Sequence, residues 1–392
     1  MKDYIDIQER PSWGRMLPLS FQHLFAMFGS TVLVPYLLKV DPATALFMNG
    51  IGTLLYLFVC KGKIPAYLGS SFAFIAPVAG VLSAGLGYEA AKGAFVVFGL
   101  SFVILSILVR YIGTRWIDKL FPPAAMGAIV AIIGLELAPV AMSMSFLAVI
   151  PVLIGVVSGY VLSAVMGVVD FSGVEAAPWL SLPQFYGMPV FDINAIIMIM
   201  PALFVVFAEH VGHLVVTSNI VARDLMKEPG LQRSLLGDGL ANILSGFFGA
   251  TPNTTYGENI GVLAITRCFS VWVIGGAAVL AMIVSFVGKV AALIHAIPVP
   301  VMGGVSILLF GIIAASGLRM LVERKVDYTN PVNMILTSVI LVVGLSGAEL
   351  AVGPVVLKGM GLATVVGMAM SISLLILQKT GVGNDQLKKT EV

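Results

Sequence analysis

Charged residues are scarce in this chain of 392 residues: only 11% are Asp, Glu, Lys or Arg, whereas 59% are apolar. A soluble domain carries about 25% charged residues, so the composition excludes an ordinary soluble protein. The mean hydropathy of +1.03 indicates a polytopic membrane protein. Cysteine is also rare, and Cys60 and Cys268 stand in no motif, so neither a disulfide nor a thiolate metal site is expected. The polar start runs straight into the first apolar segment, so we expect no cleavable signal peptide.

The apolar runs divide the chain into 13 candidate membrane spans. Ten have bilayer length, at residues 17–38, 43–60, 91–112, 122–143, 146–168, 193–216, 268–287, 299–315, 332–346 and 359–377. Three are short or interrupted, at residues 69–84, 236–249 and 254–265. As helices, these three reach only about 18–24 Å, less than the hydrocarbon core of about 30 Å. The sequence therefore predicts an all-α membrane fold that contains broken helices.

The basic residues predict the orientation of the chain. If the N-terminus is cytoplasmic, 18 of the 22 Lys and Arg residues lie on the cytoplasmic side. Only Lys39, Lys92, Lys289 and Lys358 then lie outside. The positive-inside rule favours this arrangement. We therefore expect a multi-pass protein of the cell inner membrane with both termini in the cytoplasm.

One stretch does not fit this alternation. The 110–119 loop is basic and the 169–192 loop has acidic residues only, so an odd number of crossings must separate them. Only two windows, 122–143 and 146–168, lie between these loops. Either one crossing is missing from this sequence or residues 122–168 fold unusually.

Two glutamates lie in segments that are otherwise suited to hydrocarbon. Glu209 is in the apolar run 193–216, and Glu258 opens the short segment 254–265. An ionised carboxylate in a bilayer costs several kcal/mol or more, so such residues normally face the protein interior, a ligand or an ion path. These two side chains are the first candidates for a binding site.

Two broken segments stand at matching places in the two halves of the chain. Residues 65–74 (PAYLGSSFAF) and 249–258 (GATPNTTYGE) each lead, through Gly and small polar residues, into a half-length apolar helix. Such pairs indicate the binding site of a transporter built from inverted repeats, because free N–H groups at a helix start can bind an acceptor atom. The alternative is that Gly and Pro are simply common in membrane helices.

Glu209 and His213 are spaced i,i+4, so both project from one face of a helix. A carboxyl and an imidazole one turn apart can exchange a proton; the alternative is a hydrogen bond that only packs helices. Glu258 follows Gly257 at the second helix start, where acceptors and donors together suit a planar ligand with alternating N–H and C=O edges. The alternative role of Glu258 is to cap its own helix.

The run from Glu209 to His213 resembles a metalloprotease helix only at first sight. The zincin order is H-E-x-x-H, whereas His210 and His213 are i,i+3 and no third ligand is evident. We therefore expect no metal, and His210 is interpreted as a packing residue. His23 either supports the site or is a satisfied core histidine.

Other polar residues in the spans have simpler interpretations. Glu136 lies near the end of its span, where an interfacial position is expected. Ser70 and Ser71 are interpreted as partners of the backbone, although either could reach a ligand.

These residues carry a family resemblance that covers nearly the whole chain. The stretch from Glu258 to Arg267 (ENIGVLAITR) fits the signature (Gln/Glu/Pro)-Asn-x-Gly-x4-Thr-(Arg/Lys/Gly) of the nucleobase–cation symporters in the nucleobase–ascorbate transporter family. QHLFAMFG, GKIPAYLGSSFAF, AEHVGHL and TPNTTYGENIG resemble the branch of bacterial uracil:proton symporters.

The resemblance implies two inverted seven-helix repeats, folded as a core domain and a gate domain, with two short antiparallel strands at the broken helices. The implied boundaries are core 1–116, gate 117–192, core 193–297, gate 298–380 and a cytoplasmic tail 381–392. The family's gate domain has one span more than this sequence shows, and by this resemblance about thirty residues are absent near 143–146. This is the place where the charge rule also fails.

The resemblance also implies the roles of individual residues. Glu209 and Glu258 bind the nucleobase through their side chains, and Phe72 and Gly257 bind it through backbone N–H groups. His213 couples Glu209 to the proton. Supporting residues are Tyr256, Ser71, His23 and Phe310, the last of which replaces a tyrosine of close relatives.

The sequence therefore predicts uptake of uracil with a proton by alternating access. The protonated site binds uracil from outside, and proton release to the cytoplasm weakens the hold of Glu209. No enzymatic activity, organic cofactor or nucleic acid partner is expected, and a homodimer through the gate domain is possible. The alternatives are a symporter for another base, such as xanthine or urate, and a uracil-binding sensor or transport-defective protein that results from the missing span.

Overall fold

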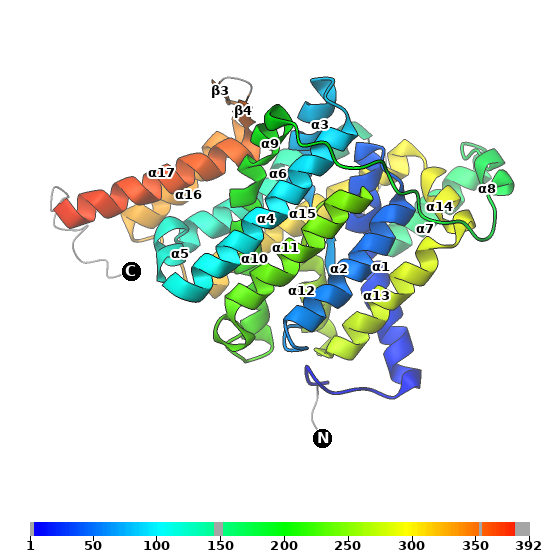
Figure 1. Ribbon diagram of the computed structural model, residues 1–392, viewed down its shortest axis with the longest axis horizontal. Helices are drawn as coiled ribbons and strands as arrows, with labels where there is room; N and C mark the ends of the chain where they lie inside the picture. The colour runs from blue at the N-terminus through cyan, green and yellow to red at the C-terminus, as the bar shows by residue number, and fades with distance from the viewer. Residues whose placement is uncertain (1–3, 145–151, 353–354, 381–392) are drawn as a thin grey trace.

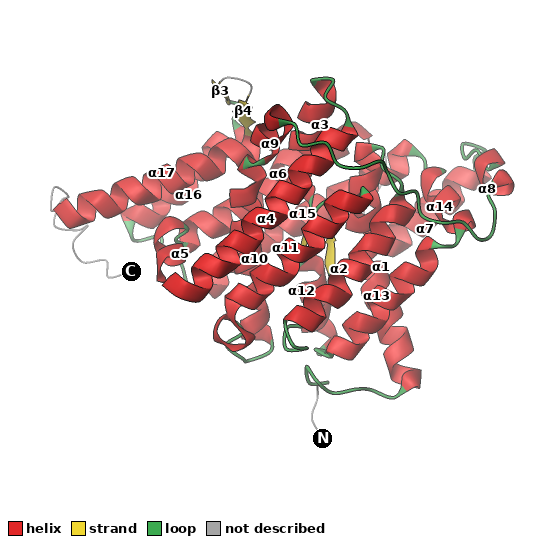
Figure 2. Ribbon diagram, viewed as in Figure 1, coloured by secondary structure: helices red, strands yellow, loops and turns green. Residues whose placement is uncertain are grey.

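The computed structural model describes residues 4–144, 152–352 and 355–380. Helices form most of this part of the chain, and strands occur only as short pieces (Figure 2). Within these ranges, six helices are long and apolar enough to cross a membrane, and four shorter apolar helices accompany them. The predicted helical membrane fold is confirmed, whereas the count of 13 spans is not.

Five helices pack together as a first helix group: α1 (Trp13–Leu38), α2 (Pro42–Val59), α4 (Tyr88–Ile112), α11 (Leu231–Phe248) and α13 (Val271–Ser285). Helices α4 and α11 lie side by side (Figure 1). Glycine permits this close approach, because a Cβ on Gly99 would lie 2.7 Å from the carbonyl oxygen of Gly239. Small residues are common where membrane helices meet, because lipid provides no hydrophobic driving force for association and close backbone packing replaces it.

A second helix group consists of α6 (Pro123–Met144), α7 (Val152–Val165), α15 (Val299–Glu323), α16 (Pro331–Leu345) and α17 (Gly359–Thr380). Helices α6 and α15 are in close contact, because a Cβ on Gly127 would lie 3.0 Å from the carbonyl oxygen of Gly317. Helix α10 (Pro201–Ile220) contacts members of both groups. Apart from the helices of the two broken segments, the remaining helices among the described residues are α5 (Arg115–Leu120), α8 (Ser172–Ala176), α9 (Ile193–Ile199), α14 (Gly288–His295) and η2 (Met226–Gly230).

The two broken segments meet inside the bundle. The first consists of β1 (Leu68–Ser70), η1 (Phe72–Phe74) and α3 (Ile75–Ser83); the second consists of β2 (Asn253–Thr255) and α12 (Gly257–Thr266). Strands β1 and β2 pair antiparallel, with Leu68 opposite Thr255. The predicted pair of short antiparallel strands is confirmed.

Both edges of this small sheet have hydrogen-bond partners in the protein, as irregular backbone at membrane depth requires. On the β1 side, the backbone N–H of Leu68 donates to Thr53 Oγ1 of α2 at 2.9 Å. On the β2 side, the backbone N–H of Asn253 donates to Asn242 Oδ1 of α11 at 2.6 Å, and Asn242 Nδ2 donates back to Asn253 O at 3.0 Å. Side chains of the first helix group thus hold both strands in place.

Two elements differ from the sequence-based expectation. The window 236–249 was predicted to be short, but α11 is an 18-residue helix. Its first turns contain Gln232, Arg233 and Asp238, and these polar residues lower the mean hydropathy of the helix. Asp238 is nevertheless fully buried and accepts a hydrogen bond from Asn242 Nδ2. The hairpin of β3 (Glu349–Val352) and β4 (Val355–Lys358) was not predicted.

The predicted external loop contains an extended segment, residues 177–192, which we call the strap. It runs from α8 to α9 across one end of the first helix group, as the green segment in Figure 1 shows. Thr44 Oγ1 donates to Gln184 O at 2.5 Å, and the N–H of Asp41 donates to the Tyr186 hydroxyl oxygen at 2.8 Å. Lys92 Nζ donates to the carbonyl oxygen of Gly187.

Two predictions fall partly on residues outside the described ranges. The unusual stretch near 143–146 reaches into residues 145–151, which separate α6 from α7. The predicted tail 381–392 lies outside the described residues entirely.

Candidate functional site

The structure brings six predicted site residues to one cavity: Phe72, Glu209, His213, Tyr256, Gly257 and Glu258. They come from η1, α10, α12 and the residue that precedes α12. These segments are far apart in the sequence, and the β1–β2 pairing is what brings the first and last of them together. This juxtaposition is the geometric core of the candidate site.

Phe72 and Gly257 are the first residues of η1 and α12. The N–H groups of a first turn have no partner within their own helix, and the helix dipole places positive potential there. Both starts reach the same cavity. The site therefore has hydrogen-bond donors that are fixed by the backbone.

The two glutamates provide acceptors at the same cavity. Among the described residues, Glu209 Oε2 and Glu258 Oε1 have no hydrogen-bond partner. Buried polar atoms are normally paired, so unpaired carboxyl oxygens beside a cavity indicate a ligand. Glu209 is only 8% exposed, which agrees with a site shielded from lipid.

The ring of His213 has a defined orientation. Its Nδ1 lies 2.8 Å from the carbonyl oxygen of Thr255. Because a carbonyl can only accept, Nδ1 must carry the proton. The other nitrogen, Nε2, lies toward Gly257, where a Cβ would be 3.3 Å away. In the neutral ring, Nε2 is therefore the atom available to accept a proton.

The opposite wall of the cavity belongs to the second helix group. Val130 of α6 and Ile312, Ile313 and Ser316 of α15 line it. A Cβ on Gly257 would lie 3.2 Å from Ser316 Oγ, so this hydroxyl is close to the α12 start. Sequence reasoning missed these four residues because apolar and small residues in a span carry no signal of their own.

The supporting residues occupy different positions around the cavity. The ring of Phe310 packs edge to face on Phe72, with centroids 5.3 Å apart. Ser71 Oγ accepts from the N–H of Ala73 at 3.3 Å, as expected for a backbone partner. His23 Nδ1 lies 2.8 Å from Asn259 Oδ1. None of Phe310, Ser71 and His23 lines the cavity.

A buried polar network lies behind the site. His210 Nδ1 is 3.2 Å from Asp238 Oδ2, and its Nε2 is 2.8 Å from Ser234 Oγ. Ser234 Oγ is also 2.6 Å from the Tyr56 hydroxyl. His210 is thus a packing residue, as predicted, but one with a carboxylate partner. The sequence gives no signal for Asp238, because residues 236–249 are predicted to be a short apolar segment.

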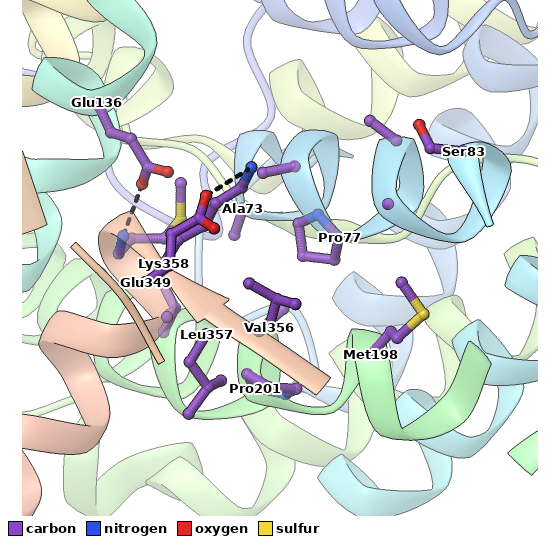
Figure 3. A pocket seen from close by; sticks show the side chains of 17 residues that line it. Ala73, Pro77, Ser83, Glu136, Met198, Pro201, Glu349, Val356, Leu357 and Lys358 are labelled. Atoms are coloured by element: carbon purple, nitrogen blue, oxygen red, sulfur yellow. Dashed lines mark hydrogen bonds and ion pairs between the residues drawn. The ribbon is translucent and has the colours of Figure 1, made fainter. Parts of the chain in front are cut away.

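A second and larger cavity lies next to the site. Its volume is about 480 Å3, and helices α3, α10 and α17 line it together with the β3–β4 hairpin. Ala73 and Val205 line this vestibule and are close in sequence to Phe72 and Glu209. Glu136 accepts from the N–H of Met360 at 2.6 Å, and Lys358 Nζ lies 3.8 Å from Glu349 Oε1 (Figure 3). The vestibule therefore lies beside the candidate site, with η1 and α10 contributing residues to both cavities.

Within the described residues, no group of three or more His, Cys, Asp or Glu side chains is placed to hold a metal ion. The donors and acceptors around the cavity are instead arranged for a small polar molecule.

The fold has counterparts among solved transporters. The transmembrane domain of the cyanobacterial bicarbonate transporter BicA superposes with a TM-score of 0.63 at 13% identity, over 95% of this chain and all of that domain. A murine Solute Carrier 26 family anion transporter in the inward-facing state gives a TM-score of 0.63 at 12% identity, over 96% of this chain and 69% of that chain. These likenesses concern the fold alone.

Sequence comparison is more specific. The uracil permease of Paenibacillus larvae is 55% identical over 423 aligned positions, which cover 98% of this chain and 100% of the relative. The uracil permease of Escherichia coli is 56% identical over 402 positions, covering 94% and 93%. The profile of the Permease family matches residues 14–148 and 142–353. The resemblance predicted from the sequence motifs is confirmed, and the chain belongs to the Permease family, as a membrane transporter rather than an enzyme.

Proposed function

We propose that this chain carries uracil across the cytoplasmic membrane together with a proton. The observation that carries the proposal is the joint cavity of two partnerless carboxyl oxygens, from Glu209 and Glu258, and two helix starts, at Phe72 and Gly257. The edge of uracil alternates N–H and C=O groups. The carboxyl oxygens accept from the ring N–H groups, and the backbone N–H groups donate to the ring carbonyls. The names of the relatives in Paenibacillus larvae and Escherichia coli support this choice of base.

Selectivity follows from the same groups. A base with a different edge pattern leaves buried donors and acceptors unpaired, and each unpaired group costs about 1–3 kcal/mol. Such a site rejects analogues by lost hydrogen bonds rather than by size alone. Xanthine and urate are therefore expected to be weak competitors.

The size of the cavity supports an alternating movement. Its volume is about 10 Å3, which is room for about one water molecule. Uracil can enter only if the walls separate, and those walls belong to α6 and α15 on one side and to η1, α10 and α12 on the other. We infer that the second helix group moves against the broken helices to admit and release the base.

Proton coupling is assigned to Glu209 and His213. They are one turn apart on α10, and His213 already donates from Nδ1 to Thr255. A proton that arrives at the site is held by Glu209 or by His213 Nε2. On Glu209 the proton lets the carboxyl also donate to a ring carbonyl of uracil, so its release removes that hydrogen bond and weakens the hold of Glu209. The basic end of the bundle, where Arg223 pairs with Asp6 and Lys63 with Glu228, is assigned to the cytoplasm.

The test is uracil uptake into proteoliposomes with an inward proton gradient. Glu258→Gln is expected to weaken uracil binding at least tenfold, because a hydrogen bond to a charged group contributes about 1.5–3 kcal/mol. Glu209→Gln resembles the protonated carboxyl, so it is expected to bind uracil but to lose the dependence of uptake on the proton gradient. Glu175→Gln, on the exposed helix α8 and away from both cavities, is the control and keeps wild-type uptake. Wild-type binding and uptake in both site variants would exclude the proposed site.

The shortened stretch needs its own experiment. The alignment with the Paenibacillus larvae relative has 423 positions and this chain has 392 residues, so at least 31 positions have no counterpart here. The family profile matches this chain in two parts, which overlap at residues 142–148. This division supports a missing segment between α6 and α7. Insertion of the corresponding segment of the relative should leave uracil binding unchanged and raise the uptake rate. A rate that does not change would show that the short form transports as well as its relatives.

A further inference from the structure

A groove of about 510 Å3 runs along the surface of the first helix group, away from the candidate site. Helices α1, α2 and α13 form it, and it begins at Arg10, just before α1. Leu54 and Leu57 of α2 line it beside Gly275 of α13, where a Cβ would lie 3.9 Å and 3.7 Å from their methyl groups. Neither the transport site nor the vestibule includes any of these residues.

The groove follows one face of α1 and one face of α13. On α13 it is lined by residues at positions 271, 272, 275, 276, 279 and 280, the repeat of one helix face. Gly275 and Gly276 lie in the middle of this face and contribute no side chain to it. The lined part of α13 extends about 14 Å at 1.5 Å per residue, close to one leaflet of a hydrocarbon core of about 30 Å. The groove thus has the length and apolar lining of an acyl-chain site.

A cation marks the polar end of the groove. The guanidinium carbon of Arg10 lies 5.3 Å from the ring centroid of Trp13 and 5.1 Å from that of Trp272. The two indoles hold the guanidinium between them by cation–π contact. Tryptophan beside a basic residue is typical of the membrane interface.

Arg10 has no ion pair within the part of the chain that the structure describes. Nearby acidic side chains are engaged elsewhere: Asp6 pairs with Arg223 at 2.8 Å, and Glu9 Oε2 accepts from the N–H of Asp6 at 3.2 Å. The guanidinium therefore keeps its charge and its donors for an external anion.

We propose that this groove binds an anionic phospholipid from the leaflet at the basic end of the bundle. Arg10 takes the phosphate, the indoles of Trp13 and Trp272 lie at headgroup level, and one acyl chain lies on the α13 face. Charge complementarity selects this occupant. A zwitterionic lipid has no net negative charge and therefore gains less from an unpaired guanidinium. A free phosphate does not contact the apolar lining of the groove. An apolar helix of a second copy would cover the lining but would supply no anion for Arg10.

The test uses the full chain, purified in detergent and freed of lipid. Native mass spectrometry follows the binding of added palmitoyl-oleoyl phosphatidylglycerol or the matching phosphatidylcholine. We expect the tightest site to prefer phosphatidylglycerol about fivefold or more, the scale of one basic residue at a charged membrane surface. Arg10→Gln should abolish that preference. Arg15→Gln is the matched control, because Arg15 is an exposed basic residue of the same helix end that does not line the groove.

A second readout locates the lipid. Phosphatidylglycerol with brominated acyl chains should quench the fluorescence of Trp272 at lower mole fraction than brominated phosphatidylcholine does, and Trp272→Phe should remove that component. Equal loss of preference in Arg10→Gln and Arg15→Gln would reduce the effect to general surface charge and overturn the proposal. Equal binding of both lipids by the wild-type chain, or a dimer that excludes lipid, would also overturn it.

Discussion

The rings of Phe72 and Phe310 meet edge to face, with centroids 5.3 Å apart and planes at 87°. This contact joins the start of η1, which lines the candidate site, to helix α15 of the second helix group. Any movement that opens the cavity between these elements must change this aromatic pair. The contact is therefore a sensitive place to alter both binding and movement.

Phe310→Tyr adds a hydroxyl group to this contact. If the hydroxyl finds a partner at the site, one hydrogen bond contributes about 0.5–1.5 kcal/mol, or about two- to twelvefold in uracil affinity. Isothermal titration of purified protein with uracil measures the change. Phe310→Leu is the comparison, because it removes the ring edge without adding a hydroxyl and should weaken binding. Equal affinity of all three proteins would exclude a role for this position in binding.

Ser316 is the polar residue that the second helix group contributes to the cavity wall. We expect Ser316→Ala to weaken uracil binding about threefold to tenfold, the effect of one lost hydrogen bond. Ser316→Val fills the space beside Gly257 and should weaken binding further. Ser306→Ala is the control on the same helix, because Ser306 Oγ only donates to Met302 O at 2.7 Å within α15. A loss in the control as large as in Ser316→Ala would indicate a general effect on the helix.

Gly69 in β1 lies against the ring of Tyr256, and any Cβ at this position would overlap that ring. Gly69→Ala should therefore displace Tyr256 from the cavity wall and weaken uracil binding at least tenfold. Tyr256→Phe keeps the ring but loses the hydroxyl donor to the Ser70 carbonyl oxygen, so it should have a smaller effect. Binding isotherms of both variants show which one loses more uracil affinity. The reverse order would mean that the hydrogen bond matters more than the packing.

The buried pair of His210 and Asp238 supports the fold behind the site. Removing one member of a buried pair leaves the other polar group without its partner and costs about 3–5 kcal/mol, so Asp238→Ala should lower the free energy of unfolding by that amount. Asp224→Ala removes one member of the exposed pair with Lys227 and should have little effect. Denaturant unfolding in detergent compares the two. Similar stabilities would show that Asp238 is not part of the structural core.

The positions of Glu209, His213 and Glu258 in one cavity could be predicted from the sequence, because charged residues are conspicuous in apolar spans and the i,i+4 spacing is local. The strand pair could be expected from the two Gly-rich lead-ins and the family resemblance. These features depend on short-range patterns, which a single sequence displays directly.

The remaining features depend on long-range packing. Asp238 looks unsuited to a membrane helix until its partners, His210 and Asn242, are known. Ser316 and Val130 become site residues only because α15 and α6 lie against the broken helices. The hairpin β3–β4 pairs residues whose sequence reads as an ordinary loop. Hydropathy cannot report such relationships, because it scores each residue without its neighbours in space.

The strap restricts how the protein can open at the end that it crosses. It is attached to α2 through Thr44 and to α4 through Lys92, and its backbone at Ser181 donates to Phe286 O at 2.9 Å, just after α13. Because the strap is attached to α2, to α4 and to the residue just after α13, it resists separation of these three helices. The first helix group should therefore turn as one rigid piece, and the hinges should lie at the chain segments that leave it.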